Sequence, residues 1–234
     1  MNHQFIELEV QEGVKMDVYK AFPEGKGPFP GLLLFQEAFG VNHHIQNIAE
    51  RLCKEGYAVY APDLFHRTGK RLDIAYADFA LAMPHFQAIN YENLNLDIKA
   101  CYHSFQEDIS VKSDRIGCFG FCLGGRVAFY TNTILPIKAS IAFYGGGINA
   151  LAERAHLISA PQLFVWGGKD ERITPEIRKE IIEATEKANK PYVSAIFSQA
   201  NHAFNCDERP NNYHEASAKE AWALSIAFLS NHLK

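Results

Sequence analysis

Apolar residues recur along the chain in two alternating patterns, one typical of strands and one typical of helices. Residues 5–10 and 14–19 alternate apolar and polar side chains around a Glu-Gly turn, which predicts an antiparallel hairpin. Residues 31–36 are nearly all apolar, as in a strand that is covered on both faces. Residues 42–56 then repeat apolar side chains at helical spacing, with Asn42 as the capping residue. The chain is therefore expected to begin with a hairpin, a buried strand and a helix.

The same alternation continues to the end of the chain. Further strands are predicted at residues 57–62, 115–121, 137–145 and 191–199, and residues 160–170 are predicted to form a strand that ends in a loop. Further helices are predicted at residues 90–108, 123–131, 174–190 and about 213–233. Residues 63–90, which contain the helix breaker Pro84, are predicted to form a loop with short helices. We therefore expect an α/β fold: a doubly wound, mostly parallel sheet of about eight strands with an antiparallel start and helices on both faces. No repeat or linker interrupts the pattern, so residues 1–234 are expected to form a single domain.

Composition and charge exclude several classes of protein. The formal net charge is −4, so the chain lacks the basic surplus that neutralises nucleic-acid phosphates. Apolar runs such as residues 32–35 are too short to span a bilayer, and the first ten residues lack the pattern of a secretory signal. We expect a cytoplasmic monomer or small homo-oligomer that binds a small molecule, not nucleic acid or a membrane.

The cysteines give no sign of a disulfide or metal framework. Their number, five, is odd, and no Cys-x-x-Cys motif occurs. Cys53, Cys101 and Cys118 fall on predicted apolar faces and are expected to lie in the core. We expect neither a metal nor an organic cofactor.

The pentapeptide Gly-Phe-Cys-Leu-Gly at residues 120–124 lies between a predicted strand and a predicted helix. Glycines on both sides permit a sharp turn that exposes the central side chain, Cys122. The helix N-terminus favours a thiolate there, and the N–H of Leu123 can donate to an oxyanion. The alternative is a buried structural cysteine in a glycine turn.

Ligands bind beyond the carboxyl ends of the strands in such sheets, and three more reactive side chains follow predicted strands. Asp170 and His202 come after Cys122 in the chain order nucleophile, acid, histidine that α/β-hydrolases share. A histidine can act as the base for a thiol when a carboxylate fixes its tautomer. Taken singly, Asp170 can also be a loop cap and His202 a polar loop residue.

Glu37 is the third of these side chains and directly follows the apolar strand at residues 31–36. A carboxylate beside a thiol can accept its proton or hold it neutral. The N–H of Ala38 is a candidate for the second oxyanion donor. The alternative is that Glu37 is a solvated loop acid.

Five segments resemble those of a known family in order and spacing: LLLFQEAFGVN, GYAVYAPDLF, IGCFGFCLGGRVAF, FVWGGKDERIT and NHAFN. They resemble the dienelactone hydrolases, the carboxymethylenebutenolidase group of the α/β-hydrolase fold, over about residues 15–233. The resemblance implies Cys122 as the nucleophile, His202 as the base and Asp170 as its orienting carboxylate. It also implies that Glu37 holds the resting thiol in check until substrate displaces it, and that Leu123 and Ala38 donate to the oxyanion.

The chain departs from that family at the substrate-binding site. Dienelactone hydrolases place an arginine for the substrate carboxylate four residues after the catalytic histidine, where this sequence has Cys206. Cysteine cannot form the bidentate pair that arginine makes with a carboxylate. The candidates to bind a substrate carboxylate are Arg67, Arg71 and Arg209. The candidates to line the pocket are Tyr144, Phe39 and Phe204.

The sequence therefore predicts a cysteine-dependent carboxylic ester hydrolase that cleaves a lactone or small ester through an acyl-thioester. Two other functions stay open on the same fold. One is a thiol redox or sensing protein, because an activated cysteine oxidises readily. The other is a binder without catalysis.

Overall fold

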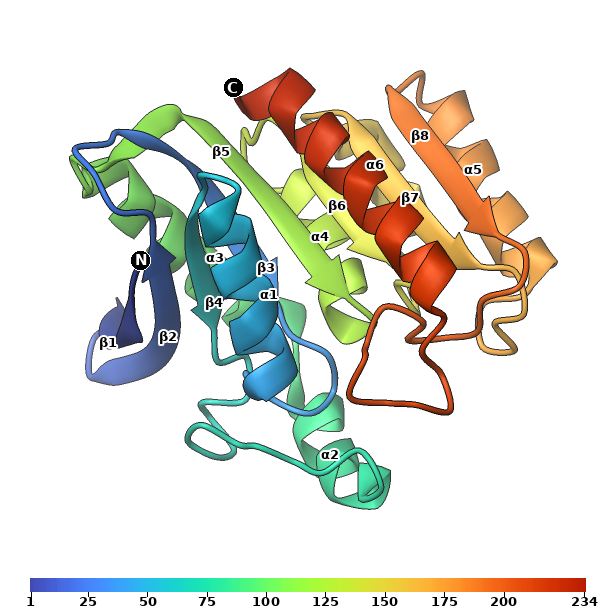
Figure 1. The fold of residues 1–234 in the computed structure, drawn as a ribbon, viewed down its shortest axis with the longest axis horizontal. Helices are drawn as coiled ribbons and strands as arrows, with labels where there is room; N and C mark the ends of the chain where they lie inside the picture. Colours follow the sequence, from blue (N-terminus) through green and yellow to red (C-terminus); the bar gives the residue numbers. More distant parts are fainter. The chain divides into compact units, whose positions relative to one another are not determined.

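A computed structural model describes residues 1–234 as two compact units, Met1–Gly117 and Cys118–Lys234 (Figure 1). The division falls within strand β5 (Val111–Phe121), so β5 contributes to both units. The expectation of a single domain stays a prediction. No helix combines the length and the apolar character needed to cross a bilayer.

The first unit holds an antiparallel hairpin joined to parallel strands. Its elements are β1 (Asn2–Gln11), β2 (Val14–Phe22), β3 (Phe29–Phe35), α1 (His43–Lys54), β4 (Ala58–Pro62), α2 (Phe79–Ala88), α3 (Tyr91–Glu107) and the start of β5. The strand order is β1-β2-β4-β3-β5, and the first antiparallel pairs give way to a parallel β3–β4 pair. Figure 1 shows α1 in front of these strands and α3 behind them. The predicted hairpin and the helix at residues 42–56 are confirmed.

Helix α1 forms where its sequence pattern predicts it. The Asn42 side chain accepts a hydrogen bond from the N–H of Ile45 at 3.2 Å and so caps the helix start. Its apolar stripe faces the core, and Gly56, with a φ of +90°, allows the chain to leave the helix. The helix therefore returns the chain from β3 to the start of β4.

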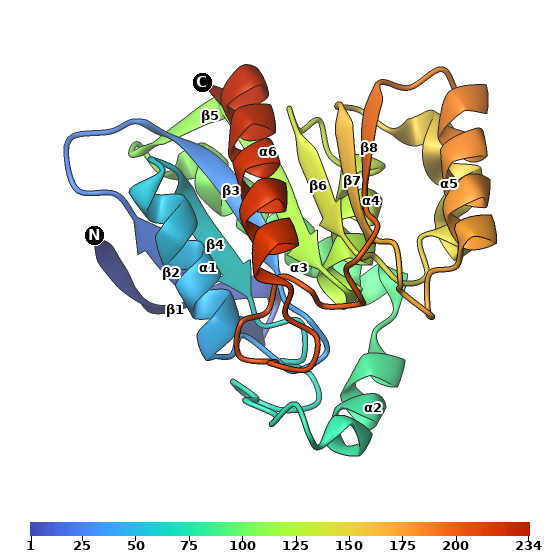
Figure 2. The ribbon, with the colours of Figure 1, turned by 45° about the vertical axis from the view of Figure 1, so that its right-hand side comes forward.

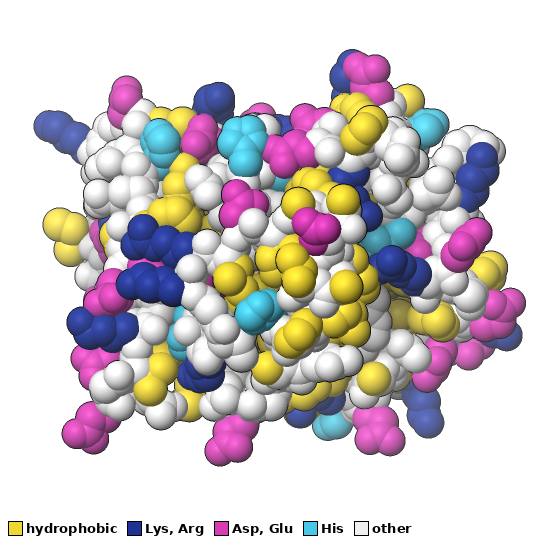
Figure 3. All heavy atoms as spheres, turned by 90° about the horizontal axis from the view of Figure 1, so that it is seen from below, with side chains coloured by type: hydrophobic (Ala, Val, Ile, Leu, Met, Phe, Trp, Pro, Cys, Tyr) yellow, Lys and Arg dark blue, Asp and Glu magenta, His cyan; other side chains and the backbone are white.

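Helix α2 is the one helix that lies within the segment at residues 63–90. It contains Pro84, and Ala82 is its one buried residue. Ala82 packs into a small cluster with Ala38, Phe39 and Ile74, whereas Leu81 is 64% exposed. Figure 3 shows hydrophobic side chains gathered on the face that carries α2. The predicted loop is confirmed, with one helix in place of several short ones.

The second unit is a parallel sheet with helices on both faces. Its elements are the end of β5, α4 (Leu123–Asn132), β6 (Ser140–Phe143), the 3-10 helix η1 (Asn149–Leu157), β7 (Gln162–Gly167), α5 (Pro175–Lys187), β8 (Tyr192–Phe197) and α6 (Glu215–Leu233). The order is β5-β6-β7-β8, and all three pairs are parallel. Figure 2 shows α6 and α5 on opposite faces of these strands.

The count of eight strands and six α-helices, with an antiparallel start, confirms the predicted fold class. Helix η1 was not predicted, because its residues lack the apolar repeat that marks a helix. The register aligns the carboxyl ends of neighbouring strands: Phe121 pairs with Phe143, and Gly167 pairs with Phe197. The residues that follow these four positions therefore share one edge of the second unit.

A buried amide joins α4 to the beginning of β7. The side-chain Nδ2 of Asn132 donates to the carbonyl of Ala160 at 3.0 Å and to Oε1 of Gln162 at 3.2 Å. Its Oδ1 accepts from the N–H groups of Ala160 at 2.9 Å and Ser159 at 3.3 Å. Since a buried polar group is costly when unpaired, this satisfied amide fixes where β7 begins.

We predict that Asn132→Ala lowers the free energy of unfolding by about 2–4 kcal/mol, because several buried donors and acceptors lose their hydrogen-bond partner. Urea unfolding followed by circular dichroism measures the change. The control Asn211→Ala, at an exposed position, should stay within about 0.5 kcal/mol of wild type. Equal stabilities of the two variants would contradict the role given to Asn132.

Candidate active site

Cys122 lies at the turn between β5 and α4 in a backbone conformation that most residues avoid. Its φ is +53° and its ψ is −111°, and a positive φ is costly for a residue with a side chain. The Cys122 N–H donates to the carbonyl of Phe143 at 3.0 Å, and its carbonyl accepts from Gly125 N–H at 3.1 Å. These bonds hold the strained residue, and the predicted sharp strand-to-helix turn is confirmed. Cys122 is partly exposed, whereas the other four cysteines are buried.

Two glycines make this turn possible. A Cβ atom at Gly120 would lie 2.0 Å from the carbonyl oxygen of Gly124, and one at Gly125 would lie 2.7 Å from that of Phe143. Both distances are well inside van der Waals contact with backbone that cannot move aside cheaply. The chain can therefore pass from strand to helix here only if these positions carry no side chain.

Asp170 and His202 meet in the second unit as the sequence predicted. Asp170 follows β7 and His202 follows β8, and both side chains are buried. Nδ1 of His202 lies 2.7 Å from Oδ2 of Asp170, so Nδ1 carries a proton and donates a hydrogen bond to the carboxylate. Oδ1 of Asp170 accepts from the N–H groups of Arg172 at 2.9 Å and Ile173 at 3.2 Å. Both carboxylate oxygens are therefore engaged, and the carboxylate has one orientation.

The charges of this cluster shift the pKa values of both members. Burial disfavours the charged imidazolium, but attraction and hydrogen bonding from Cys122 and Asp170 outweigh it and raise the pKa of His202 to about 10. Burial also works against the Asp170 carboxylate, but the hydrogen bond and charge of His202 hold the pKa of Asp170 below its usual range. The pair thus favours a protonated His202 beside the Asp170 carboxylate.

The second ring nitrogen of His202, Nε2, differs from Nδ1 in its surroundings. Nε2 is buried and has no conventional hydrogen-bond partner. The Cys122 side chain nevertheless acts on the imidazole strongly enough to raise its pKa. Since Nδ1 is held by Asp170, Nε2 is the nitrogen left to exchange a proton with the sulfur.

Tyr144 packs against the imidazole of His202, and Phe204 packs against Tyr144. The ring centroids of Tyr144 and His202 are 5.1 Å apart, and those of Tyr144 and Phe204 are 5.6 Å apart. Both aromatic side chains are fully buried, and Phe204 also contacts Phe143 and Phe197. They support the histidine from within the core, and their contact with substrate stays a prediction.

The predicted residues after β3 belong to the first unit. Glu37, Ala38 and Phe39 are all buried. Neither carboxylate oxygen of Glu37 has a hydrogen-bond partner, which is costly for a buried acid. Glu37 is therefore not a solvated loop acid. Phe39 packs edge-on against Tyr76, with ring centroids 4.7 Å apart.

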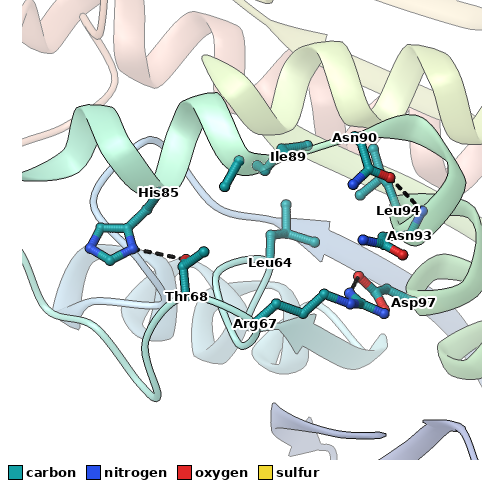
Figure 4. A pocket seen from close by; sticks show the side chains of 10 residues that line it. Leu64, Arg67, Thr68, His85, Ile89, Asn90, Asn93, Leu94 and Asp97 are labelled. Carbon is teal, nitrogen blue, oxygen red and sulfur yellow. Dashed lines mark hydrogen bonds and ion pairs between the residues drawn. The ribbon is translucent and has the colours of Figure 1, made fainter.

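Two of the candidate arginines already have carboxylate partners in the first unit. Nη1 of Arg67 lies 2.5 Å from Oδ2 of Asp97, and Nη2 of Arg71 lies 2.6 Å from Oδ1 of Asp17. Figure 4 shows Arg67 and Asp97 side by side at a small pocket. That pocket is lined by Leu64, Arg67, Thr68, His85, Ala88, Ile89, Asn90, Asn93, Leu94 and Asp97. Arg209 is partly buried in the turn after Cys206, where its N–H donates to the carbonyl of Cys206.

The sequence did not identify two residues that contact the loops of Asp170 and His202. Asn212 donates from Nδ2 to the carbonyl of His202 at 3.0 Å. Arg178, on α5, reaches the loop that carries Asp170. In the sequence Asn212 is one of several loop amides, and Arg178 is one of several charges on a helix. No pattern distinguishes either from a surface residue.

Comparisons with known proteins agree with this architecture. Residues 16–233 match the model of the dienelactone hydrolase family. The chain is 33% identical to a Salmonella typhimurium protein named "Putative carboxymethylenebutenolidase", over 94% of this chain and 84% of that one. A Klebsiella pneumoniae structure described as a "Putative Dienelactone Hydrolase" superposes with a TM-score of 0.86 at 28% identity, over 99% of this chain and 100% of that one. A dienelactone hydrolase from Anabaena variabilis, at 16% identity, matches with a TM-score of 0.73 over 100% and 99% of the two chains and bears on the fold alone. The expected α/β-hydrolase fold is confirmed.

We predict that Asp170→Asn lowers the pKa of His202 from about 10, because the imidazolium loses its carboxylate partner. Titration of the His202 ring by NMR measures it. A raised pKa stabilises the fold fully below the ordinary value of 6.5, and that stabilisation is lost as the pH rises toward 10. The wild type should therefore lose stability over this range more steeply than Asp170→Asn.

Glu171→Gln is the matched control, since it removes an exposed acid from the same loop. It should leave the His202 titration unchanged. An unaltered titration in Asp170→Asn would disprove the coupling between the two side chains.

Proposed function

Since the chain belongs to the dienelactone hydrolase family and is a hydrolase of esters or lactones, we propose that Cys122 is its nucleophile and that an acyl-thioester is the intermediate. One observation carries this proposal. The imidazole of His202 is fixed by a 2.7 Å hydrogen bond to Asp170, and its free Nε2 is coupled to the thiol that the strained turn presents. This is the arrangement of nucleophile, base and orienting acid that acyl transfer needs.

In the first half of the reaction the sulfur of Cys122 becomes bonded to the carbonyl carbon. His202 holds the thiol proton at Nε2, the thiolate attacks, and the carbonyl electron pair moves to oxygen. When the oxyanion collapses, the carbon–oxygen bond of the ester breaks and the departing alkoxide takes the proton from Nε2. An acyl-thioester remains on Cys122. In a lactone the leaving hydroxyl stays attached to the acyl group.

In the second half water replaces the sulfur. His202, now neutral, accepts a proton from water at Nε2 as the oxygen attacks the thioester carbonyl. Collapse of this second oxyanion breaks the carbon–sulfur bond and returns the thiolate beside a protonated His202. Asp170 fixes the imidazole throughout and stabilises its charged form without taking the proton.

The oxyanion needs donors that are in place before it forms. We assign this role to the backbone N–H groups of Leu123 and Ala38. Leu123 is the first residue of α4, so its N–H is not needed within the helix. Ala38 follows β3 beside Glu37, and its role rests on the sequence pattern of the family.

Glu37 is proposed to keep the resting thiol uncharged. Its side chain is 1% exposed and has no hydrogen-bond partner, so a carboxylate there is suited to repel a thiolate and keep the thiol protonated. Substrate would displace it and release the thiolate to pair with His202. This gives the buried acid a function that core packing does not explain.

The substrate is proposed to be a small lactone or an activated ester, because the acyl-thioester that an ordinary ester would form on Cys122 hydrolyses slowly. Cys206 stands where the family has an arginine for a substrate carboxylate. If the substrate is anionic, Arg209 or Arg67 would have to bind it, and Arg67 would first have to leave Asp97. Tyr144, Phe39 and Phe204 are the proposed apolar lining.

We predict that Cys122→Ala abolishes turnover of p-nitrophenyl acetate and of dienelactone, by at least about 10³-fold in kcat/KM. In the wild type, rapid quenching followed by mass spectrometry should find an acetyl group on Cys122. Cys53→Ala, which removes a different buried thiol, should retain activity. Equal rates for wild type and Cys122→Ala would contradict the proposal. Trapping a sulfenic acid on Cys122 without any esterase activity would favour a redox role instead.

We predict that Glu37→Gln speeds alkylation of resting Cys122 by iodoacetamide about tenfold, equivalent to about 1.4 kcal/mol of lost repulsion. The rate is measured without substrate by mass spectrometry of the Cys122 peptide. Glu12→Gln, in the exposed turn between β1 and β2, is the control and should alkylate at the wild-type rate. An unchanged rate in Glu37→Gln would mean that the carboxylate does not act on the thiol.

A further inference from the structure

The guanidinium of Arg178 closes the loop that carries Asp170. Nη1 of Arg178 donates to the carbonyl of Gly167 at 3.2 Å and to the carbonyl of Ile173 at 2.9 Å. Gly167 is the last residue of β7, and Ile173 directly precedes the capping residue of α5. One nitrogen therefore joins the two ends of the loop at residues 167–173, and Asp170 lies at its middle.

This arginine is unusual in its surroundings. It is 9% exposed and makes no ion pair; carbonyl oxygens accept its hydrogen bonds, and the acid that its charge acts on is Glu176, in the first turn of α5. A buried guanidinium is costly unless it is well hydrogen-bonded. Its neighbours on the inner face of α5 are Ile181 and Thr185, which fill the same kind of position without a charge. Packing alone would favour an apolar residue at 178, so the two hydrogen bonds need another reason.

The loop at residues 167–173 also orients the carboxylate of Asp170. Ile173 offers its carbonyl to Arg178 and its N–H to Oδ1 of Asp170. On the other side of the loop, the N–H of Gly168 donates to the carbonyl of Phe197, and that of Lys169 donates to the carbonyl of Ala200. These last two bonds tie the loop to the segment that leads to His202. If Ile173 moved, Oδ1 would lose a donor and Oδ2 would turn away from Nδ1.

We propose that Arg178 is a positioning residue, which holds the ends of the loop at residues 167–173 together so that Asp170 keeps its hydrogen bond to His202. It does not touch substrate. The inference rests on the proposed function, in which Asp170 orients His202 for catalysis. It adds a residue from α5, outside the nucleophile, acid and histidine, on which the rate depends.

The test uses Arg178→Met, which keeps the length of the side chain and removes its donors, and Arg178→Lys, which keeps the charge without the planar fork. Lys179→Met is the matched control, an exposed cation on the same helix. Three quantities are measured for each: the pKa of His202 by NMR, the pH profile of kcat/KM, and Tm. The NMR titration needs no substrate.

Arg178→Met should lower the pKa of His202 by part of the fall seen in Asp170→Asn and move the pH profile the same way. It should lower kcat about 10- to 100-fold with little change in KM, because the base is misplaced while the binding surface is intact. Arg178→Lys should be intermediate in both quantities. If Arg178→Met does not fold, Arg178→Lys carries the test. In an Asp170→Asn background, Arg178→Met should have no further effect on kcat.

A His202 titration and kcat equal to those of Lys179→Met, even with a lower Tm, would overturn the inference and leave Arg178 a purely structural residue. Full additivity with Asp170→Asn would overturn it as well. Failure of the proposed function looks different. If the wild type has no hydrolase activity but the His202 titration still responds to Arg178→Met, the positioning role of Arg178 holds and the proposed reaction is refuted.

Discussion

The second unit depends on a backbone conformation at one residue. Cys122 holds a φ of +53°, which costs free energy, and the surrounding chain maintains it through the carbonyl of Phe143 and the first turn of α4. The gain is that the thiol stands at the end of a buried strand and at the start of a helix. The glycines at 120 and 125 are a consequence, since no other residue lets strand and helix approach so closely.

The histidine and its acid obey a second constraint, which is the parallel register of β7 and β8. Gly167 and Phe197 are paired, so the loops that follow them leave the sheet together. Asp170 and His202 can then meet at 2.7 Å although 32 residues separate them. Backbone N–H groups and Arg178 hold the acid, and Tyr144 packs against the imidazole. The reactive groups thus lie on loops, but each loop is anchored to a rigid strand.

Asp170, Arg178 and Glu37 are buried charged side chains that differ in how their charge is compensated. Asp170 is compensated by hydrogen bonds from His202 and from the backbone. Arg178 is compensated by two carbonyls, and Glu37, in the first unit, by no hydrogen bond at all. Asn132 is also buried and polar, yet its bonds only fix the start of a strand. Comparing Asn132 with the other three distinguishes a residue that specifies the fold from residues that we propose to serve the reaction.

The sequence alone determined most of the architecture, and it singled out Cys122, Asp170 and His202 as the candidate reactive residues. Alternating apolar segments specified the strands and helices, because burial of an apolar face depends on local periodicity. The Gly-Phe-Cys-Leu-Gly segment specified the turn, because its glycines are a local steric requirement. Helix η1 was missed, since it lacks an apolar repeat. The tertiary structure alone decided the roles of Arg178, Asn212 and the partners of Arg67. Those roles depend on which carbonyl or carboxylate lies within hydrogen-bond reach, and that distance is set by packing between segments remote in the sequence.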